Sequence, residues 1–115
     1  MRAVYVDAPG DIDALVIRDA PDPQPAPGDV LIEVAYAGCN WADTQIRSGI
    51  YPYPPDYPCV PGFEISGKVL STGEEVTGFA KGDKVVAISP LGGYAQKCLA
   101  PAAAVYKLPD DIPLD

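Results

Sequence analysis

Two short segments of this 115-residue chain carry the side chains best suited to chemistry: GCNWAD at 38 to 43 and PGFEISGKVLSTG at 61 to 73. A carboxamide such as that of Asn40 has donors and an acceptor, so it can hold a ribose hydroxyl or polarise a carbonyl group. Phe63 precedes the acid Glu64, and a phenyl ring cannot coordinate a metal ion. A carboxamide is also a poor zinc ligand beside thiolate or imidazole.

Residue types that are missing exclude other chemistry. The chain contains no histidine, which removes Ser-His and Cys-His catalysis and the commonest metal ligand. Its three cysteines, Cys39, Cys59 and Cys98, are far apart and form no C-x-x-C pair. We therefore expect reduced thiols that serve as small buried side chains.

Composition is typical of one soluble globular domain, with 48% hydrophobic and 21% charged residues. The net charge of −8 argues against nucleic acid or an anionic membrane as a partner, because like charges repel. No apolar run is long enough for a bilayer span, and the first residues lack the features of a secretory signal. A cytoplasmic location is expected.

Hydrophobic runs bounded by Gly, Pro or Asp predict seven short strands, which favours a β-barrel or sandwich. The predicted strands are Arg2 to Val6, Leu15 to Arg18, Val30 to Tyr36, Glu64 to Leu70, Lys84 to Ile88, Tyr94 to Leu99 and Val105 to Leu108. The fourteen prolines fall mainly in two stretches, 21–29 and 50–62, which predict extended loops.

One helix is expected to follow the third strand. Asn40 is suited to be its N-cap, Asp43 lies in the first turn, where the helix dipole favours an anion, and Ser48-Gly49 ends it. Asp43 and Arg47 are four residues apart and are expected to pair across one turn. The capping role is the structural alternative to a chemical role for Asn40, and one side chain can serve both.

The two segments together resemble the zinc alcohol dehydrogenase signature G-H-E-x-x-G-x-x-x-x-x-G and its earlier G-x-C-x-x-D segment. Phe63 and Asn40 stand where that signature has its zinc-binding His and Cys. The resemblance is therefore to the zinc-independent quinone oxidoreductase branch of the medium-chain dehydrogenase/reductase superfamily. The runs at 40–52, 75–87 and 92–110 follow in the family's order, so the resemblance covers nearly the whole chain.

This resemblance implies a mainly β, GroES-like, partly open β-barrel with one or two short helices, spanning residues 1–115 as a substrate and catalytic domain. It implies that the Rossmann cofactor domain lies outside this chain, so that these residues alone turn over little or nothing. The implied activity is reduction of a quinone or enone with NADPH or NADH and without zinc. The full-length protein is expected to be a homodimer.

The resemblance also assigns roles to individual residues. It implies catalytic roles for Asn40 and Tyr51, cofactor binding by Asn40 and Asp43, and a substrate pocket lined by Trp41, Tyr51 and Phe63. Structural alternatives stay open: Tyr51 packing on nearby prolines, and Trp41 and Phe63 as plain core. Glu64 is expected to be a hydrogen-bonded structural acid. Many relatives carry a second pocket tyrosine where this chain has Gln45.

Two other functions remain open at this point. A stand-alone GroES-like module would act through protein contacts, and its ring assembly would need a mobile loop that the proline-rich stretch at 50–62 does not resemble. The chain is also compatible with the matching half of an enoyl thioester reductase.

Overall fold

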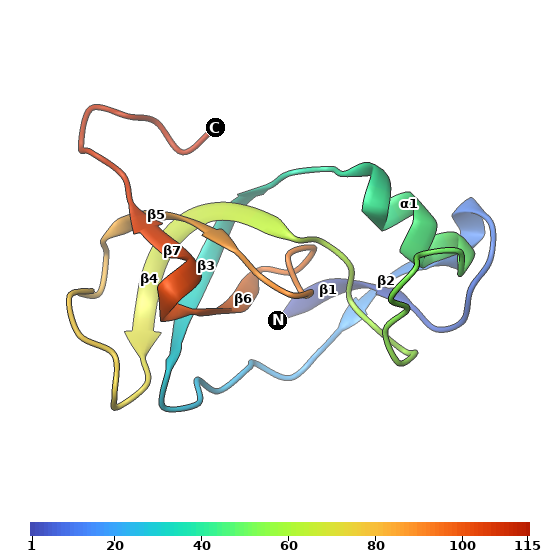
Figure 1. Cartoon of the computed structure of the whole chain (residues 1–115), viewed down its shortest axis with the longest axis horizontal. Coiled ribbons are helices and arrows are strands. Elements are labelled where there is room, and N and C mark those ends of the chain that lie inside the picture. The colour runs from blue at the N-terminus through green and yellow to red at the C-terminus, as the bar shows by residue number, and fades with distance from the viewer.

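A five-stranded antiparallel sheet forms the larger part of the molecule, which the computed structural model describes over residues 1–115. In spatial order its strands are β6 (Lys97–Pro101), β3 (Asp29–Ala37), β4 (Glu64–Thr72), β5 (Lys84–Ile88) and β7 (Val105–Lys107). The long strands β3 and β4 curl, so the sheet closes part of the way into a half-barrel (Figure 1). Register shifts between β3 and β4 accompany this curl, since bulges bend a strand.

A separate two-stranded sheet pairs β1 (Arg2–Val6) with β2 (Leu15–Asp19), joined through the short 3-10 helix η1 (Ile12–Ala14). Two isolated bridges tie this hairpin to the rest of the chain, Ala3 to Ala95 and Val6 to Cys59. The hairpin thus lies beside the proline-rich 50–62 loop and the segment that leads into β6.

The helix α1 (Trp41–Ser48) follows β3, as predicted, and a second 3-10 helix, η2 (Ala102–Ala104), precedes β7. The predicted pairing of Asp43 with Arg47 is wrong. Arg47 reaches to the hairpin instead, where Nη1 donates to the Gly10 carbonyl at 2.8 Å and lies 3.4 Å from Asp11 Oδ1. Asp43 turns inward, because its face of the helix is covered by other segments. No helix of the structure has the length and apolar character needed to cross a membrane.

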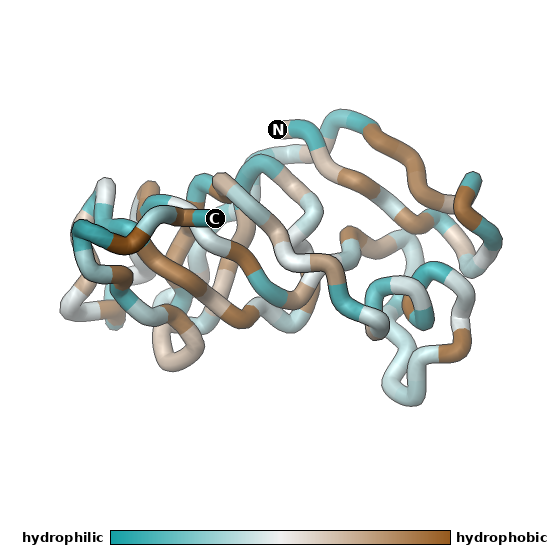
Figure 2. Tube along the Cα trace, turned by 90° about the horizontal axis from the view of Figure 1, so that it is seen from above, coloured by the Kyte–Doolittle hydropathy of each residue, from teal (hydrophilic) through white to brown (hydrophobic).

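Two clusters of buried side chains hold the fold. The larger fills the half-barrel with Val30, Ile32, Ile65, Val69, Val85, Ala87, Cys98, Ala100 and Val105. The smaller joins β1, α1 and the 50–62 loop through Val6, Ile46 and Cys59. Figure 2 shows hydrophobic stretches in both regions. Cys59 and Cys98 are buried, as expected, whereas the prediction is wrong for Cys39, whose side chain is exposed.

The predicted mainly β fold with one short helix is confirmed, and most strand bounds agree within two residues. The exception is β6, which begins at Lys97 and not at Tyr94. Residues 94–96 bond to β1 instead, with Val4 N–H donating to the Tyr94 carbonyl at 2.9 Å and Gln96 N–H to the Arg2 carbonyl at 3.1 Å. This connection brings Tyr94 close to the start of α1.

Candidate active site

Asn40 occupies the N-cap of α1 with an extended backbone, as the sequence predicts. Asn40 and Asp43 form a capping box, in which the Asn40 N–H donates to Asp43 Oδ2 at 2.8 Å. In the other half of the capping box the Asn40 side chain lies near the Asp43 N–H. That N–H donates to the Asn40 backbone carbonyl at 3.1 Å, so the Asn40 side chain forms no cap hydrogen bond. The two amide N–H donors of the half-buried Asn40 side chain have no partner in the chain. They are free to bind a ligand.

The Asp43 carboxylate joins three segments of the chain. Its side chain is buried, and Oδ2 accepts the Asn40 N–H at 2.8 Å and the Tyr94 hydroxyl at 2.7 Å. Oδ1 accepts the Gly62 N–H at 3.0 Å. These three donors compensate the burial of an acid that has no cationic partner. All the hydrogen bonds observed at the two oxygens of Asp43 come from the chain itself, so they do not test whether Asp43 binds a cofactor. The cofactor-binding role stays a prediction.

Tyr94 is a site residue that sequence reasoning missed. Burial and the hydrogen bond to Asp43 raise the pKa of its phenol well above the usual range, so the hydroxyl stays a donor. Its partner lies 51 residues earlier in the chain, and local spacing cannot reveal such a contact. The one signal in the sequence is its position directly after Gly92-Gly93, a pair that is typical of a turn and indicates no contact with Asp43.

Tyr51 and Phe63 lie together beside the smaller core cluster. Their ring centroids are 6.0 Å apart with planes inclined at 46°, and the Tyr53 ring meets Tyr51 edge-on at 6.3 Å. Both Tyr51 and Phe63 are half-buried and pack against the cluster of Val6, Ile46 and Cys59. The Tyr51 hydroxyl has no hydrogen-bond partner in the chain, which leaves it available to a bound molecule.

Trp41 does not join this aromatic group. Its side chain is 76% exposed at the first position of α1. A wall of the substrate pocket built from Trp41 together with Phe63 therefore stays a prediction, and the plain-core alternative for Trp41 is wrong.

Glu64 begins β4 with an exposed side chain and makes no side-chain hydrogen bond, so the expected hydrogen-bonded structural role is wrong. The acid sits at the rim of the sheet, where water can solvate it. Its side chain lies directly against Gly38: a Cβ atom added to Gly38 would overlap the Glu64 side chain. Gly38 N–H also donates to the Glu64 backbone carbonyl at 3.0 Å. Glycine at 38 thus lets the segment before Asn40 approach the start of β4.

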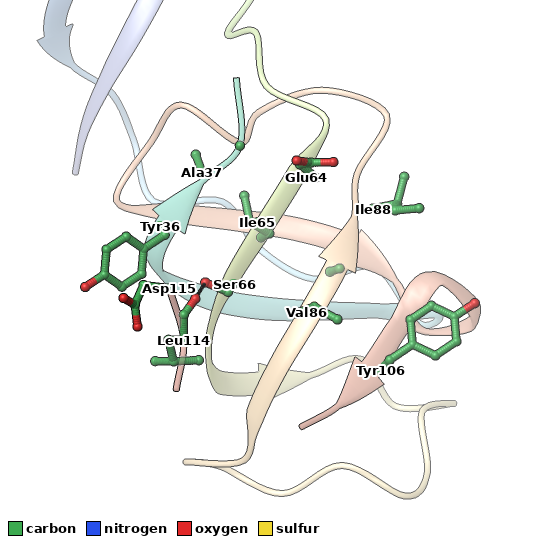
Figure 3. A pocket seen from close by; sticks show the side chains of 12 residues that line it. Tyr36, Ala37, Glu64, Ile65, Ser66, Val86, Ile88, Tyr106, Leu114 and Asp115 are labelled. Carbon is green, nitrogen blue, oxygen red and sulfur yellow. Dashed lines mark hydrogen bonds between the residues drawn. The ribbon is translucent and has the colours of Figure 1, made fainter. Parts of the chain in front are cut away.

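A pocket of about 550 Å³ adjoins this point and has Gly38 and Glu64 in its wall. Most of the remaining wall comes from β3, β4, β5, β7 and the C-terminal residues (Figure 3). Ser66 donates to the Leu114 carbonyl across it. Asn40, Tyr51 and Phe63 do not line this pocket, which therefore lies beside the predicted site and not within it.

All predicted site residues except Trp41 are thus linked by a series of contacts. Asn40 bonds to Asp43, Asp43 bonds to the residue before Phe63, and Phe63 packs on Tyr51. No group of three or more His, Cys, Asp or Glu side chains is arranged to hold a metal ion. Asn40 offers free amide donors, and Tyr51 offers a free phenol donor on an aromatic surface; groups of these kinds suit a planar molecule with a carbonyl oxygen.

Comparisons with known proteins identify the family of this domain. The family model for the alcohol dehydrogenase GroES-like domain matches residues 26–110. A quinone oxidoreductase of Lama guanicoe is 41% identical over 114 residues, which is 97% of this chain and 34% of the relative.

Solved structures extend the likeness to three dimensions. A human synaptic vesicle membrane protein VAT-1 homolog-like protein is 37% identical with a TM-score of 0.96, covering 99% of this chain and 36% of that one. The Escherichia coli quinone oxidoreductase complexed with NADPH is 31% identical with a TM-score of 0.94, over 99% and 35%. The chain therefore spans about a third of the length of these relatives.

Proposed function

The chain belongs to the family of alcohol dehydrogenase GroES-like domains, and from this premise we propose that it is the substrate-binding and catalytic domain of an NAD(P)H-dependent oxidoreductase. The proposed substrates are quinones or activated enones, and the reaction needs no zinc. Relatives named quinone oxidoreductase, one of them solved with NADPH, support this proposal. The observation that carries it is the Asn40 carboxamide, whose donors have no partner in the chain and which stands where zinc relatives have a metal ligand.

In the proposed site Asn40 orients the reactants. Its amide donors hydrogen-bond the acceptor carbonyl or a ribose hydroxyl of the cofactor, which are tasks that need no metal ion. The N-cap position holds the base of this side chain in place, because the Asn40 N–H is bonded to the buried Asp43. Asn40 therefore offers its donors from a fixed backbone.

Tyr51 and Phe63 form the proposed aromatic surface under a flat acceptor. The pair excludes water from the reacting atoms, and the Tyr51 hydroxyl donates a hydrogen bond or a proton to the acceptor oxygen. Such a bond stabilises the negative charge that develops on that oxygen.

The residues present fit the nicotinamide end of a cofactor and not its phosphates. When bound, NADPH or NADH supplies the hydride. Residues 1–115 contain no G-x-G-x-x-G motif, so pyrophosphate binding is proposed for a Rossmann domain elsewhere in the whole protein. Residues 1–115 alone are therefore expected to bind the cofactor weakly and to turn over little.

The proposal is tested with the full-length protein that carries this chain. NADPH and NADH oxidation is followed at 340 nm with benzoquinone or naphthoquinone, with a simple enone and with an enoyl thioester, before and after dialysis against a zinc chelator. Quinone or enone reduction that survives chelation supports the proposal. Preference for the thioester would identify an enoyl reductase, and no turnover with any acceptor would favour a binding module.

A matched pair of variants separates the site from the fold. Asn40→Ala removes the amide donors and is expected to lower kcat/KM about 10²-fold. The control is Gln96→Ala, which also removes a carboxamide, in the segment before β6, and is expected to leave the rate within about twofold. Equal effects of the two changes would contradict a direct role for Asn40.

The proposal extends to the assembly and the location of the full-length protein. We propose a homodimer of the full-length protein in the cytoplasm, with a small molecule as its substrate and with neither nucleic acid nor membrane as a partner. Light scattering of the purified protein and fractionation of the source cells test these points.

A further inference from the structure

The half-buried Tyr94 donates its hydroxyl to the buried Asp43, and Tyr94 has no role in the chemistry proposed above. An aspartate in the first turn of a surface helix usually interacts with the helix dipole while it points to water. Asp43 is only 7% exposed and points inward. Its carboxylate is therefore held in one orientation by its partners.

Tyr94 is anchored independently of α1. Its N–H donates to the Pro61 carbonyl at 2.9 Å, and its carbonyl accepts the Val4 N–H at 2.9 Å. The ring passes close over Gly62, where a Cβ atom would lie 2.7 Å from Tyr94 N and 2.8 Å from ring atom Cδ1. Gly62 also has a φ of 100°, which other residues rarely adopt. Glycine at 62 thus lets Tyr94 pack directly on this segment while its hydroxyl reaches Asp43 Oδ2 at 2.7 Å.

The two backbone groups that Asp43 binds belong to a residue of the proposed site or directly precede one. One is the N–H of Asn40 itself, at 2.8 Å. The other is the N–H of Gly62, at 3.0 Å, directly before Phe63. A single carboxylate therefore fixes both the amide side of the site and its aromatic side.

The phenol is the only side-chain donor to this carboxylate. The other two donors are backbone N–H groups, and no lysine or arginine pairs with Asp43. Without the hydroxyl, Oδ2 would keep only the Asn40 N–H and Oδ1 only the Gly62 N–H, and the vacated side of Oδ2 would have to bind water. Two of the three bonds that orient Asp43 would remain, so the loss of Tyr94 is expected to loosen this orientation.

We propose that Tyr94 is a positioning residue, whose phenol holds the Asp43 carboxylate in the orientation from which it fixes Asn40 and the Gly62-Phe63 segment. The catalytic consequence rests on the proposed function, since it requires that Asn40 orient the reactants. The positioning itself does not, because it is a property of the hydrogen bonds alone.

The first test measures positioning directly in the full-length protein labelled with ¹⁵N-asparagine. The Asn40 signals are those that disappear in Asn40→Gln. In Tyr94→Phe the Asn40 backbone amide is expected to shift upfield and to exchange with solvent about tenfold faster. Tyr5→Phe is the control, since its hydroxyl has no hydrogen-bond partner in the chain, and should change neither property. An unchanged Asn40 amide in a folded Tyr94→Phe protein would overturn the proposal.

A second measurement needs no variant and so remains decisive if Tyr94→Phe does not fold. The Tyr94 hydroxyl and the Asn40 N–H donate to the same oxygen, Asp43 Oδ2. In the wild-type protein the hydroxyl proton should therefore be protected from exchange and should show a nuclear Overhauser effect to the Asn40 amide proton. Absence of this proton signal in the spectrum at low temperature would also overturn the proposal.

The third test is kinetic and separates positioning from a general loss of structure. Tyr94→Phe is expected to lower kcat about tenfold with little change in the KM for NADPH. Combined with Asn40→Ala it should cost clearly less than it does alone, because the Asn40 side chain that it positions is already gone and only its effect on the Gly62-Phe63 segment remains. Multiplying effects would contradict action through Asn40. If the wild-type protein reduces no acceptor, the proposed function fails, while the two magnetic resonance tests still decide the positioning role.

Discussion

The rings of Tyr51 and Phe63 lie 6.0 Å apart with their planes inclined at 46°. Tyr51 comes from the proline-rich loop after α1, and Phe63 from the residue before β4. The contact therefore joins two segments that carry predicted site residues. The Tyr51 ring packs on Phe63, as aromatic rings commonly do in proteins, while the Tyr51 hydroxyl has no hydrogen-bond partner in the chain.

Two substitutions at Tyr51 separate these properties. Tyr51→Phe keeps the ring, so the free energy of unfolding should stay within about 0.5 kcal/mol of wild type, while kcat for quinone reduction by the full-length protein falls about 10²-fold. Tyr51→Ala removes the ring as well and should cost about 2 kcal/mol. Urea unfolding and steady-state kinetics check both. An unchanged kcat in Tyr51→Phe would leave Tyr51 with a packing role only.

Close packing of Gly38 on Glu64 predicts a suppressor. Gly38→Ala places a Cβ atom on the Glu64 side chain and should destabilise the protein by about 1–3 kcal/mol. Glu64→Ala alone should be nearly neutral, because that side chain is exposed and unbonded. In the double variant most of the lost stability should return.

Urea unfolding of wild type, the two single variants and the double variant completes this double-mutant cycle. Gly28→Ala is the control, since a Cβ atom at Gly28 meets nothing within 4 Å. Strictly additive effects of Gly38→Ala and Glu64→Ala would show that the overlap is relieved in some other way.

Local patterns in the sequence predicted the elements of this fold well, because alternating hydrophobic residues and the Gly and Pro residues between them act over a few positions. The helix from Trp41 to Ser48 and the strands β1 and β5 are examples. The contacts of Asp43 were not predictable in this way. Helical spacing indicated Arg47 as its partner, whereas the fold supplies Tyr94 from 51 residues away.

The exposure of side chains at the ends of elements was equally hard to predict. Glu64 begins an apolar strand and so indicated a buried acid, but the first residue of β4 lies at the rim of the sheet. Trp41 begins α1 and is similarly exposed. Buried residues follow closely in both elements, Asp43 in α1 and Ile65 in β4, and only the three-dimensional boundary of the core decides which side chains are exposed.

Removal of the Asp43 carboxylate should be costly to the fold. Asp43→Ala leaves the Asn40 and Gly62 N–H groups and the Tyr94 hydroxyl without their acceptor, and we expect a loss of about 3 kcal/mol or more. Asp13→Ala, an exposed acid in the first turn of η1, is the matched control and should change stability by less than about 0.5 kcal/mol. Urea unfolding measures both. Equal, small effects would mean that water replaces the carboxylate at little cost.

The raised pKa of Tyr94 predicts a specific loss of stability in alkali. Burial and the hydrogen bond to Asp43 are the main causes, and Cys39 also contributes. In the unfolded chain the phenol loses its proton near pH 10, whereas in the folded protein it keeps it. Above pH 10 the unfolded state therefore binds fewer protons, and the free energy of unfolding falls as pH rises, by up to about 1.4 kcal/mol per pH unit for this one group.

Comparison of wild type with Tyr94→Phe isolates this contribution. Tyr57, Cys59 and Cys98 also have a raised pKa, mainly through burial, and they lower the stability of both proteins in alkali. Urea unfolding at a series of pH values should give parallel curves up to about pH 9 and a steeper fall for wild type above pH 10. If the two curves stayed parallel to pH 11, the Tyr94 phenol would ionise as readily in the folded protein as in the unfolded chain, and its hydrogen bond to Asp43 would not persist in solution.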